Sequence, residues 1–517
     1  MGWIKIQAIG HLARESLLFS IPKLISDLMI SKRAILIIIS AVLCISVSAQ
    51  KQWNQFRGPE GMGVALDKAE YPVILKQQEN QIWTIDLNTG VSSPVIWEDM
   101  IFLTSHRKDT FETVAINRQS GELIWQKEVI ADKVQRFHPI SSAAAPSVVT
   151  NGKEVISYFG SYGLLCYNMQ GDLLWERKLP IERNMYGVSV SPIIYKNQLV
   201  FSRDSDEMSY IETINIATGE TIWRTDRPNY NGNWATPGFH RTEDKDEILV
   251  YGVFSMKSYD FNTGEELWTL PKLTDEPATT PLSYHGLIYV TTYNMKSNPE
   301  VLGLPTYDSL LGLYDKNENK QLNFEEIKEN TSILSRYDAD GEGDHPLPGF
   351  FRGLDKDRDG ELTREEYQKV VDWIDSFGWS NALIALKPPV DNGGLPEIVW
   401  EYEYGVPECP SPLIKDGLAY MVKNGGIVTC LDAASGELKY KEELSAGGPY
   451  YASPVCADGK IYLTSGRGVI TVLEEGGNFK VLAENNLNER IQATPALVDG
   501  KVYVRTHKGL SAYGVVK

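Results

Sequence analysis

A short element that recurs eight times constrains the fold of this chain more than any other feature. In each copy a Ser, Thr or Ala directly precedes a proline, and mostly apolar residues follow. The eight prolines are Pro94, Pro146, Pro192, Pro237, Pro281, Pro412, Pro454 and Pro495. Their successive spacings are 52, 46, 45, 44, 131, 42 and 41 residues, so one interval contains additional chain. Repeats of this length that consist of short strands are typical of propeller blades.

A second signature accompanies the first. Gly121 follows Ala115 by six residues, and Trp125 follows it by ten. Related copies are Thr213–Gly219–Trp223, Ser258–Gly264–Trp268, Cys166–Gly171–Trp175 and Cys430–Gly436–Tyr440. The glycine indicates a tight hairpin between two strands that alternate apolar and polar residues, and the tryptophan can pack between neighbouring sheets. Where Cys stands at the first position, we expect a small buried core residue.

These repeats predict an all-β fold, an eight-bladed β-propeller. The last copy, residues 491–513, lacks its fourth strand, whereas residues 81–87 near the N-terminus form a strand without a blade. We therefore expect the N-terminal strand to complete the eighth blade. This closure would leave no open end in the ring and would remove exposed strand edges, which promote aggregation.

The long interval predicts a small α-helical insertion in blade five, at residues 295–380. The propeller would then consist of residues 50–294 and 381–517. The insertion has helical periodicity. It holds 19 acidic and 10 basic side chains, so its net charge of −9 is half of the chain's net charge of −18. Its composition differs from that of the repeats, so we interpret it as a separate module.

One loop of the insertion, residues 355–366, has the spacing of an EF-hand calcium site. Calcium prefers six to eight oxygen ligands at about 2.3–2.6 Å, and a glycine at loop position 6 allows the sharp turn. Gly360 occupies that position. The expected ligands are Asp355, Asp357, Asp359, the carbonyl of Glu361 and a bidentate Glu366. Leu362 is expected to pair with a partner loop.

The partner loop, residues 315–326, keeps oxygen ligands at the same positions. The expected ligands are Asp315, Asn317, Asn319, Gln321 and Glu326. Lys320 replaces the glycine and must adopt a left-handed backbone, which costs roughly 1 kcal/mol. Only one of its first three ligands is a carboxylate, so we expect weaker binding. The alternative is a degenerate loop that only pairs with the other.

The N-terminus predicts export. Lys32 and Arg33 precede an apolar run, residues 34–47, and small residues end at Ala49. A basic segment, an apolar segment and small residues at the cleavage site form a signal peptide. We assign residues 1–49 to a signal region, with the signal peptide at 29–49, and expect a periplasmic or secreted protein without a transmembrane anchor after cleavage. A retained membrane anchor is the alternative.

Charge and motifs exclude several functions. A net charge of −18 argues against a nucleic-acid or anionic-membrane partner, because phosphate binding needs clustered Lys and Arg. The cysteines and histidines show no zinc or haem spacing, and no nucleophile elbow or phosphate loop is present. An exported protein meets millimolar calcium, so we expect loops of modest affinity to act as structural clamps.

The repeats resemble the tryptophan-docked propellers of quinoprotein (PQQ) alcohol dehydrogenases. They also resemble the non-enzymatic propeller lipoprotein of the bacterial outer-membrane assembly machinery. Residues 52–59, Gln-Trp-Asn-Gln-Phe-Arg-Gly-Pro, are similar to the opening of exported bacterial PQQ-like repeat proteins. The resemblance covers residues 52–294 and 381–517 and implies the fold far more specifically than an activity.

The resemblance makes PQQ a possible cofactor. In the dehydrogenases a calcium ion holds the quinone on the propeller axis, whereas the calcium loops here lie in a peripheral insertion. Adjacent cysteines, common in that cofactor site, and a Cys-x-x-Cys-His haem motif are both missing. No cofactor-contacting residue of the family maps onto this sequence.

Aromatic residues in the segments that enter the innermost strands predict a pocket at one mouth of the central channel. The proposed pocket residues are Tyr186, Trp234, Tyr451 and Arg490. Such a mouth can stack a quinone, a sugar or a peptide. The alternative is that these side chains only plug the channel and pack the blades.

The sequence therefore favours an exported calcium-binding propeller that acts as an interaction or scaffold protein, with a protein or glycan partner. A quinone-dependent (PQQ) oxidoreductase acting on alcohols or sugars is one alternative, and a polysaccharide-binding module is another. The absence of recognisable catalytic motifs favours a protein that is not an enzyme.

Overall fold

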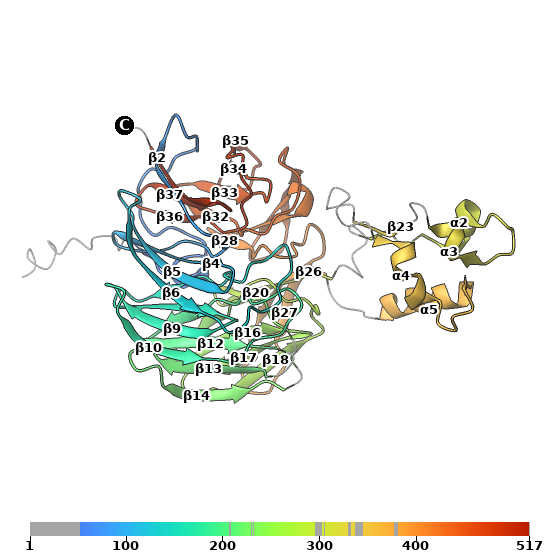
Figure 1. The fold of residues 1–517 in the computed structure, drawn as a ribbon, viewed down its shortest axis with the longest axis horizontal. Coiled ribbons are helices and arrows are strands. Elements are labelled where there is room, and N and C mark those ends of the chain that lie inside the picture. Colours follow the sequence, from blue (N-terminus) through green and yellow to red (C-terminus); the bar gives the residue numbers. More distant parts are fainter. Residues whose placement is uncertain are drawn as a thin grey trace, which may run out of the picture. The chain divides into compact units, whose positions relative to one another are not determined.

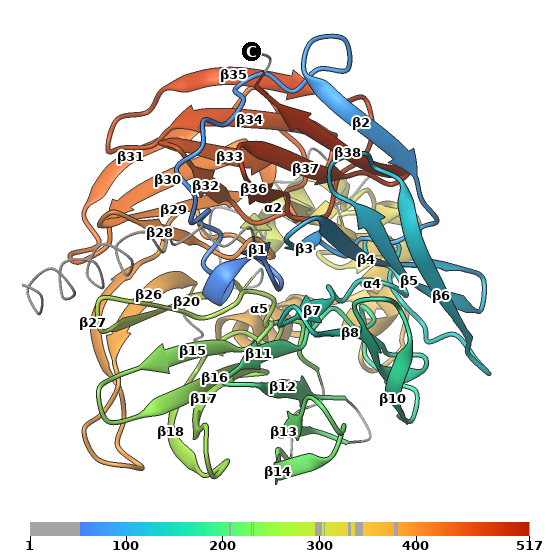
Figure 2. The same cartoon turned by 90° about the vertical axis from the view of Figure 1, so that its left-hand side faces the viewer.

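The computed structural model describes residues 52–515, except 206–207, 229, 231, 295–301, 304, 329–331, 337–344 and 377–380. The predicted signal region lies outside these residues. Strands build eight sheets of at least four strands that are arranged around one axis, as Figures 1 and 2 show. The prediction of an all-β, eight-bladed propeller is confirmed.

Each of the first four blades runs in chain order from its inner to its outer strand. Blade one has β3 (Val95–Trp97), β4 (Met100–Arg107), β5 (Thr110–Asn117) and β6 (Leu123–Ile130). Blade two has β7 (Val149–Thr150), β8 (Glu154–Phe159), β9 (Gly163–Asn168) and β10 (Leu173–Lys178). Blade three has β11 (Ile193–Tyr195), β12 (Gln198–Arg203), β13 (Tyr210–Asn215) and β14 (Thr221–Asp226). Blade four has β15 (Gly238–Arg241), β16 (Asp246–Gly252), β17 (Ser255–Asp260) and β18 (Glu266–Pro271).

The second half repeats this arrangement. Blade five has β19 (Leu282–Tyr284), β20 (Leu287–Thr292), β26 (Ala382–Lys387) and β27 (Glu397–Tyr402). Blade six has β28 (Leu413–Lys415), β29 (Leu418–Lys423), β30 (Ile427–Asp432) and β31 (Leu438–Glu443), with a short 3-10 turn η3 (Asn424–Gly426). Blade seven has β32 (Val455–Ala457), β33 (Lys460–Thr464), β34 (Val469–Glu474) and β35 (Val481–Asn486). Blade eight has β36 (Ala496–Val498), β37 (Lys501–Arg505) and β38 (Gly509–Gly514).

The N-terminal strand completes blade eight, as predicted. β2 (Gln81–Asp86) pairs antiparallel with β38, with Thr84 opposite Ser511. The first and last parts of the chain thus share one sheet, and the ring is closed by backbone hydrogen bonds rather than by side-chain contacts alone. β2 thereby covers the edge of β38 that would otherwise be exposed.

Hydroxyl groups link neighbouring blades around the axis. In seven consecutive hydrogen bonds of 2.9–3.2 Å, the backbone N–H of a residue two positions before an inner strand donates to the hydroxyl of its counterpart in the next blade. The residues, in order, are Thr280, Ser411, Ser453, Thr494, Ser93, Ser147, Ser191 and Thr236. In blade two the hydroxyl comes from Ser147, which follows Pro146, and not from the residue before the proline.

Tryptophans link the blades a second time, nearer the rim. The indole of Trp175 in blade two donates its Nε1–H to the carbonyl of Ile216 in blade three, at 2.8 Å. The hairpin glycine of blade three, Gly219, has a φ of +75° and lies so close that a Cβ there would meet the indole at 2.7 Å. The same close approach joins Trp83 with Gly121, Trp125 with Gly171, Trp223 with Gly264 and Trp400 with Gly436. The repeated glycine is therefore required both for the turn and for the indole.

The chain between Asn294 and Asn381 interrupts blade five. β20 and β26 are hydrogen-bonded neighbours, with Val290 opposite Ile384, and the Asn294 N–H donates to Asn381 Oδ1 at 3.1 Å. The insertion thus stands in sequence between the second and third strands of one blade. Because the strands of a blade alternate in direction, the end of β20 and the start of β26 lie on the same face as the crossovers that enter the inner strands.

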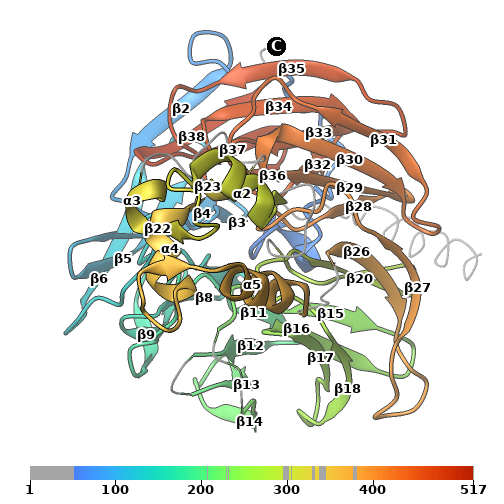
Figure 3. The ribbon, with the colours of Figure 1, turned by 90° about the vertical axis from the view of Figure 1, so that its right-hand side faces the viewer.

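The described part of the insertion is mainly helical, as Figure 3 shows. Its helices are α2 (Tyr307–Tyr314), α3 (Phe324–Ile327), α4 (Leu347–Leu354) and α5 (Arg364–Ser376). Its short strands are β21 (Leu302–Gly303), β22 (Leu322–Asn323), β23 (Ser332–Arg336), β24 (His345–Pro346) and β25 (Glu361–Leu362). A separate core holds these helices together and contains Tyr307, Leu310, Leu322, Ile327, Leu347, Phe351, Leu354, Leu362 and Tyr367.

The segment after residue 51 lies across the face opposite the crossovers. β1 (Gln52–Trp53) pairs with β3 of blade one, and Val64 forms a bridge with Cys456 of blade seven. A 3-10 turn, η1 (Pro59–Gly61), lies between them (Figure 2). Cys166 and Cys430 are buried in the blades, as predicted. Among the described residues, no helix is long and apolar enough to cross a membrane.

The contact between indole and glycine predicts a specific loss of stability. Gly219→Ala adds a strained backbone and a clash with Trp175, so we expect the free energy of unfolding to fall by about 2–4 kcal/mol. Gly286→Ala is the matched control, because Gly286 has a φ of +80° and open space around its Cβ position, and it should cost only about 1 kcal/mol. Urea unfolding of both variants measures the difference, and equal losses would contradict the indole contact.

Candidate functional site

A cavity of about 190 Å³ opens on the propeller axis, at the face where the crossovers enter the inner strands. Six hydroxyl residues of the axial ring line it: Ser93, Ser147, Ser191, Thr236, Ser453 and Thr494. Phe56, from the segment that crosses the opposite face, also lines the cavity. The channel is thus covered at one face and forms a pocket at the other.

Three of the four predicted pocket residues lie at this mouth. Tyr186, Trp234 and Tyr451 line the cavity, and each is half-buried. Arg490 is exposed and is not among the described residues that line it. Its backbone carbonyl accepts a hydrogen bond from the His507 N–H at 3.1 Å.

The aromatic wall is held in place by its own hydrogen bonds. The rings of Tyr186 and Trp234 meet edge to face, with centroids 5.1 Å apart and an interplanar angle of 80°. The Trp234 Nε1–H donates to the Gly187 carbonyl, and its backbone N–H donates to the Pro277 carbonyl, both at 3.0 Å. The indole is therefore tied to one neighbouring crossover, and the backbone of Trp234 is tied to the other.

Two carboxylates, Glu276 and Glu408, line the same cavity. The Tyr186 hydroxyl donates to Glu276 Oε1 at 3.4 Å, and Asn424 Nδ2 donates to Glu408 Oε2 at 3.2 Å. Burial raises the pKa of Tyr186 well above its usual value, and the negative charges of both glutamates raise it further. Tyr186 therefore stays protonated at neutral pH, beside two acidic groups.

Sequence reasoning missed these glutamates, although a positional signal exists. Glu276 lies five residues before Pro281, and Glu408 lies four residues before Pro412. Tyr186, Trp234 and Tyr451 lie in the same crossover window, six, three and three residues before their own prolines. A search for every side chain in this window, rather than for aromatic ones, would have found both.

The lining does not fit PQQ. This cofactor is a planar tricarboxylate, and sites for such anions use Arg, Lys or backbone N–H donors. Among the described residues that line the cavity, none is Lys, Arg or His, and two are glutamates. The cavity would repel the carboxylates of the cofactor, so we derive no reaction step through a quinone.

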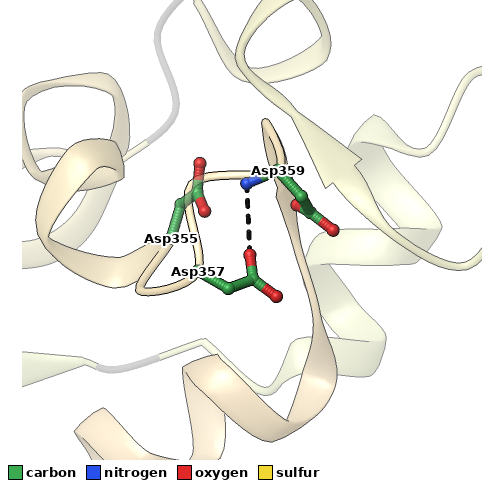
Figure 4. A group of neighbouring side chains, drawn as sticks. All are labelled: Asp355, Asp357 and Asp359. Atoms are coloured by element: carbon green, nitrogen blue, oxygen red, sulfur yellow. Dashed lines mark hydrogen bonds between the residues drawn. The ribbon is translucent and has the colours of Figure 1, made fainter.

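The second candidate site is the loop between α4 and α5. Figure 4 shows Asp355, Asp357 and Asp359 on one tight loop, and one carboxylate oxygen of each lies within 4.8 Å of the others. Gly360 has a φ of +89°, which produces the turn, and its N–H donates to Asp355 Oδ2 at 3.1 Å. The other oxygen, Asp355 Oδ1, is buried and accepts no hydrogen bond from the described residues.

Glu366 closes this loop from its far end. Its Oε1 accepts from the Lys356 N–H at 2.9 Å, and its Oε2 accepts from the N–H and hydroxyl of Thr363 at 3.0 and 2.8 Å. Burial on its own would raise the pKa of Glu366, but these donors outweigh it and lower the pKa. Glu366 is therefore held as a carboxylate against the loop.

The loop between α2 and α3 has the same internal pattern. The Lys320 N–H donates to Asp315 Oδ2 at 2.9 Å, and the Lys316 N–H donates to Glu326 Oε1 at 3.0 Å. Lys320 has a φ of +66°, as its loop position predicts. β22 and β25 pair the two loops, with Leu322 opposite Leu362.

In this loop the remaining predicted ligands form a turn of their own. Asn317 Oδ1 accepts from the Asn319 N–H at 2.9 Å, and Asn319 Oδ1 accepts from the Gln321 N–H at 2.8 Å. Among the described residues, the group of three acidic side chains close enough to hold a metal ion is Asp355, Asp357 and Asp359 of the other loop. The two loops thus share a geometry but differ in charge.

The charges at the cavity predict that PQQ does not bind. In a calorimetric titration of the full chain with PQQ under saturating calcium, we expect no saturable heat at micromolar concentrations. Tight one-to-one binding would contradict this expectation and would show that basic groups reach the cavity in solution.

A family model described as outer membrane protein assembly factor BamB matches residues 64–250 and 396–516. Among solved structures, a europium-containing methanol dehydrogenase has a TM-score of 0.52 at 12% identity, covering 91% of this chain and 92% of that chain. A quinohemoprotein alcohol dehydrogenase from Comamonas testosteroni has a TM-score of 0.51 at 12% identity, covering 92% and 82%. The computationally designed Ika8 protein has a TM-score of 0.51 at 9% identity, covering 84% and 100%.

No curated protein matches the sequence. At such low identities the solved structures establish the propeller fold and nothing about chemistry. The family model is the stronger finding, because it matches more than half of the chain and both of its segments fall on the propeller. We conclude that this protein belongs to the family described as outer membrane protein assembly factor BamB.

Proposed function

We propose that this protein is an exported calcium-binding propeller that acts as an interaction or scaffold protein. The observation that carries the calcium assignment is the convergence of Asp355, Asp357 and Asp359, together with the buried Asp355 oxygen that no described donor satisfies. A buried carboxylate oxygen without a partner is costly, and a bound cation would satisfy it.

The chemistry of the donor set favours calcium over other metals. Three carboxylates, a backbone carbonyl at Glu361 and a bidentate Glu366 provide only oxygen atoms, and their number suits the six to eight ligands of calcium. Zinc prefers nitrogen and sulfur ligands, and magnesium usually retains several waters. The loop thus offers a protein-built cage for a large, hard cation.

We assign a second, weaker calcium site to the partner loop with Asp315, Asn317, Asn319, Gln321 and Glu326. Its ligands carry fewer negative charges, which lowers affinity for a divalent ion. Its left-handed Lys320 adds strain that Gly360 avoids. Pairing of Leu322 with Leu362 joins the two loops, so binding in one loop would also order the other.

Calcium in these loops would be structural. The insertion has a small core, and clustered carboxylates such as Asp355 and Glu366 are buried against it. Without a cation their mutual repulsion opposes the fold of this module. The predicted export places the protein in a compartment where calcium is abundant, so modest affinity suffices.

The interaction role is supported by the family and by the cavity. The family's description names an assembly factor, and the propeller presents a rigid mouth with aromatic side chains such as Trp234. A protein or a glycan is the partner class that such a mouth suits. The quinone-dependent oxidoreductase remains the alternative function, and the charges of Glu276 and Glu408 weigh against it.

Removing ligands of the loop at residues 355–366 should weaken the tighter of the two calcium-binding events. We expect Asp355→Asn and Glu366→Gln each to weaken that binding by about tenfold or more, because each loses a charged ligand. Glu365→Gln is the matched control, since Glu365 is exposed, neighbours the ligand and pairs with Lys369 on the helix surface. Calorimetric titration measures both affinities, and unchanged binding in Asp355→Asn would disprove this site.

Calcium should also stabilise the chain against heat. At a free concentration of 100 times Kd, binding adds about 2.7 kcal/mol to the stability of the unit that holds the ion. Scanning calorimetry with calcium and with a chelator should show an upward shift of the transition, smaller in Glu366→Gln. A shift of equal size in that variant would mean that the ion binds elsewhere.

The weaker loop should improve when its backbone strain is relieved. Lys320→Gly removes a side chain from a left-handed position and is expected to tighten the second binding event by about fivefold, equivalent to 1 kcal/mol. Lys316→Gly is the control, because Lys316 is not in the left-handed region and glycine there only adds flexibility. If both variants tighten binding equally, the gain comes from lost positive charge and not from strain.

A further inference from the structure

The axial cavity combines aromatic faces with negative charge. Its wall presents Tyr186, Trp234 and Tyr451, and the carboxylates of Glu276 and Glu408 lie in the same lining. None of the described residues that line it is basic. This composition is independent of the calcium loops, and what it recognises goes beyond the function proposed above.

Aromatic faces and carboxylates both attract positive charge. The face of an aromatic ring is electron-rich, tryptophan most of all, and it attracts ammonium and guanidinium groups within about 6 Å of the ring centre. Carboxylates add direct Coulomb attraction, which strengthens where water is partly excluded. In this cavity the two kinds of group are adjacent, since Tyr186 Oη donates to Glu276 Oε1.

The wall is preorganised for such a ligand. Trp234 is fixed at Nε1 by Gly187 and at its backbone by Pro277, and Tyr186 is braced against its ring. Glu408 accepts from Asn424, whose own Oδ1 accepts from the Tyr450 N–H at 2.8 Å. Because these side chains are already held, binding would cost little conformational entropy.

A metal ion fits the cavity less well than an organic cation. A group of three acidic, His or Cys ligands close enough to hold a metal occurs, within the described residues, at Asp355, Asp357 and Asp359 and not at this mouth. Hard metals gain nothing from the indole of Trp234, whereas organic cations do.

The basic side chains near the mouth do not line the cavity, so the lining itself stays acidic. Lys423 is buried beside Asn424, and Arg183 lies in an adjoining groove to which Glu276 also contributes. The His138 ring meets the Tyr186 ring edge to face, with centroids 5.4 Å apart. None of these three is among the described residues that line the cavity, so its lining combines aromatic rings, two glutamates and neutral groups.

We propose that the axial cavity is a binding site for an organic cation, an alkylammonium or guanidinium group of the size of a lysine or arginine side chain. The cation would stack on Trp234 and Tyr186 and would face the carboxylates of Glu276 and Glu408. It can be carried by a side chain of a partner protein or by a free amine.

The test compares a charged ligand with a neutral ligand of the same shape. The full chain is titrated with Nα-acetyl-lysine methylamide and with its norleucine counterpart, in low salt and by calorimetry. We expect saturable binding of the lysine compound, at least about tenfold tighter than that of the norleucine compound. Equal affinities, or no binding of either, would overturn the proposal.

Variants locate the site. Trp234→Leu and Glu408→Gln should each weaken binding of the lysine compound by about tenfold, and Trp234→Phe should weaken it less, because a ring face remains. Glu243→Gln, an acidic-to-amide change on an exposed turn of blade four, is the matched control. Unchanged affinity in both Trp234→Leu and Glu408→Gln, with unchanged melting, would overturn the proposal.

Two further titrations separate the sources of the cation and separate this site from the calcium loops. A tripeptide with a central lysine that binds more tightly than n-butylammonium indicates a protein partner, and the reverse order indicates a free amine. Asp355→Asn should lose calcium affinity but keep its affinity for the lysine compound. The two proposals can then fail independently of each other. Loss of cation binding in Asp355→Asn would contradict the placement in the axial cavity.

Discussion

The ring of hydroxyls on the axis is the constraint on which the rest of the propeller depends. Inner strands converge there from all blades, and the residues just before them bring buried backbone N–H groups close together around the axis. The hydroxyl of Ser93, for example, accepts the N–H of Thr494, so the first and last blades are joined at the axis as well as through β2 and β38. Since a buried N–H without an acceptor is costly, a hydroxyl is needed at this position in nearly every blade.

The axial ring also determines where a ligand can bind. Among the described residues, its hydroxyls and Phe56 line the same cavity as the crossover side chains, so the channel forms a pocket on the side of the crossovers. Outside the ring, the contacts between indole and glycine lock each blade to the next, as at Trp175 and Gly219. The crossovers run between the axial ring and these outer contacts and are held in place by both. Tyr186, Trp234 and Glu408 therefore have defined positions.

The two candidate sites use acidic residues in different ways. In the insertion, carboxylates such as Asp355 converge on a point and leave an oxygen unsatisfied, which suits a small hard ion. At the mouth, Glu276 and Glu408 are spread among aromatic rings, which suits a larger and more diffuse cation. Both follow from a strongly acidic chain, but only the arrangement of the side chains tells them apart.

The sequence by itself determined the parts of this protein that repeat or that follow a local spacing. The proline period predicted eight blades and their closure by residues 81–87, and the loop spacing predicted the left-handed backbone of Lys320, because turns and strands are decided by neighbours along the chain. Only the tertiary structure decided the composition of the cavity. It brought Glu276, Glu408 and Phe56 to the axis, left Arg490 outside and used Ser147 in place of the residue before Pro146. The crossovers have no period, and their neighbours at the axis are distant in sequence, so no local pattern specifies which of their side chains meet.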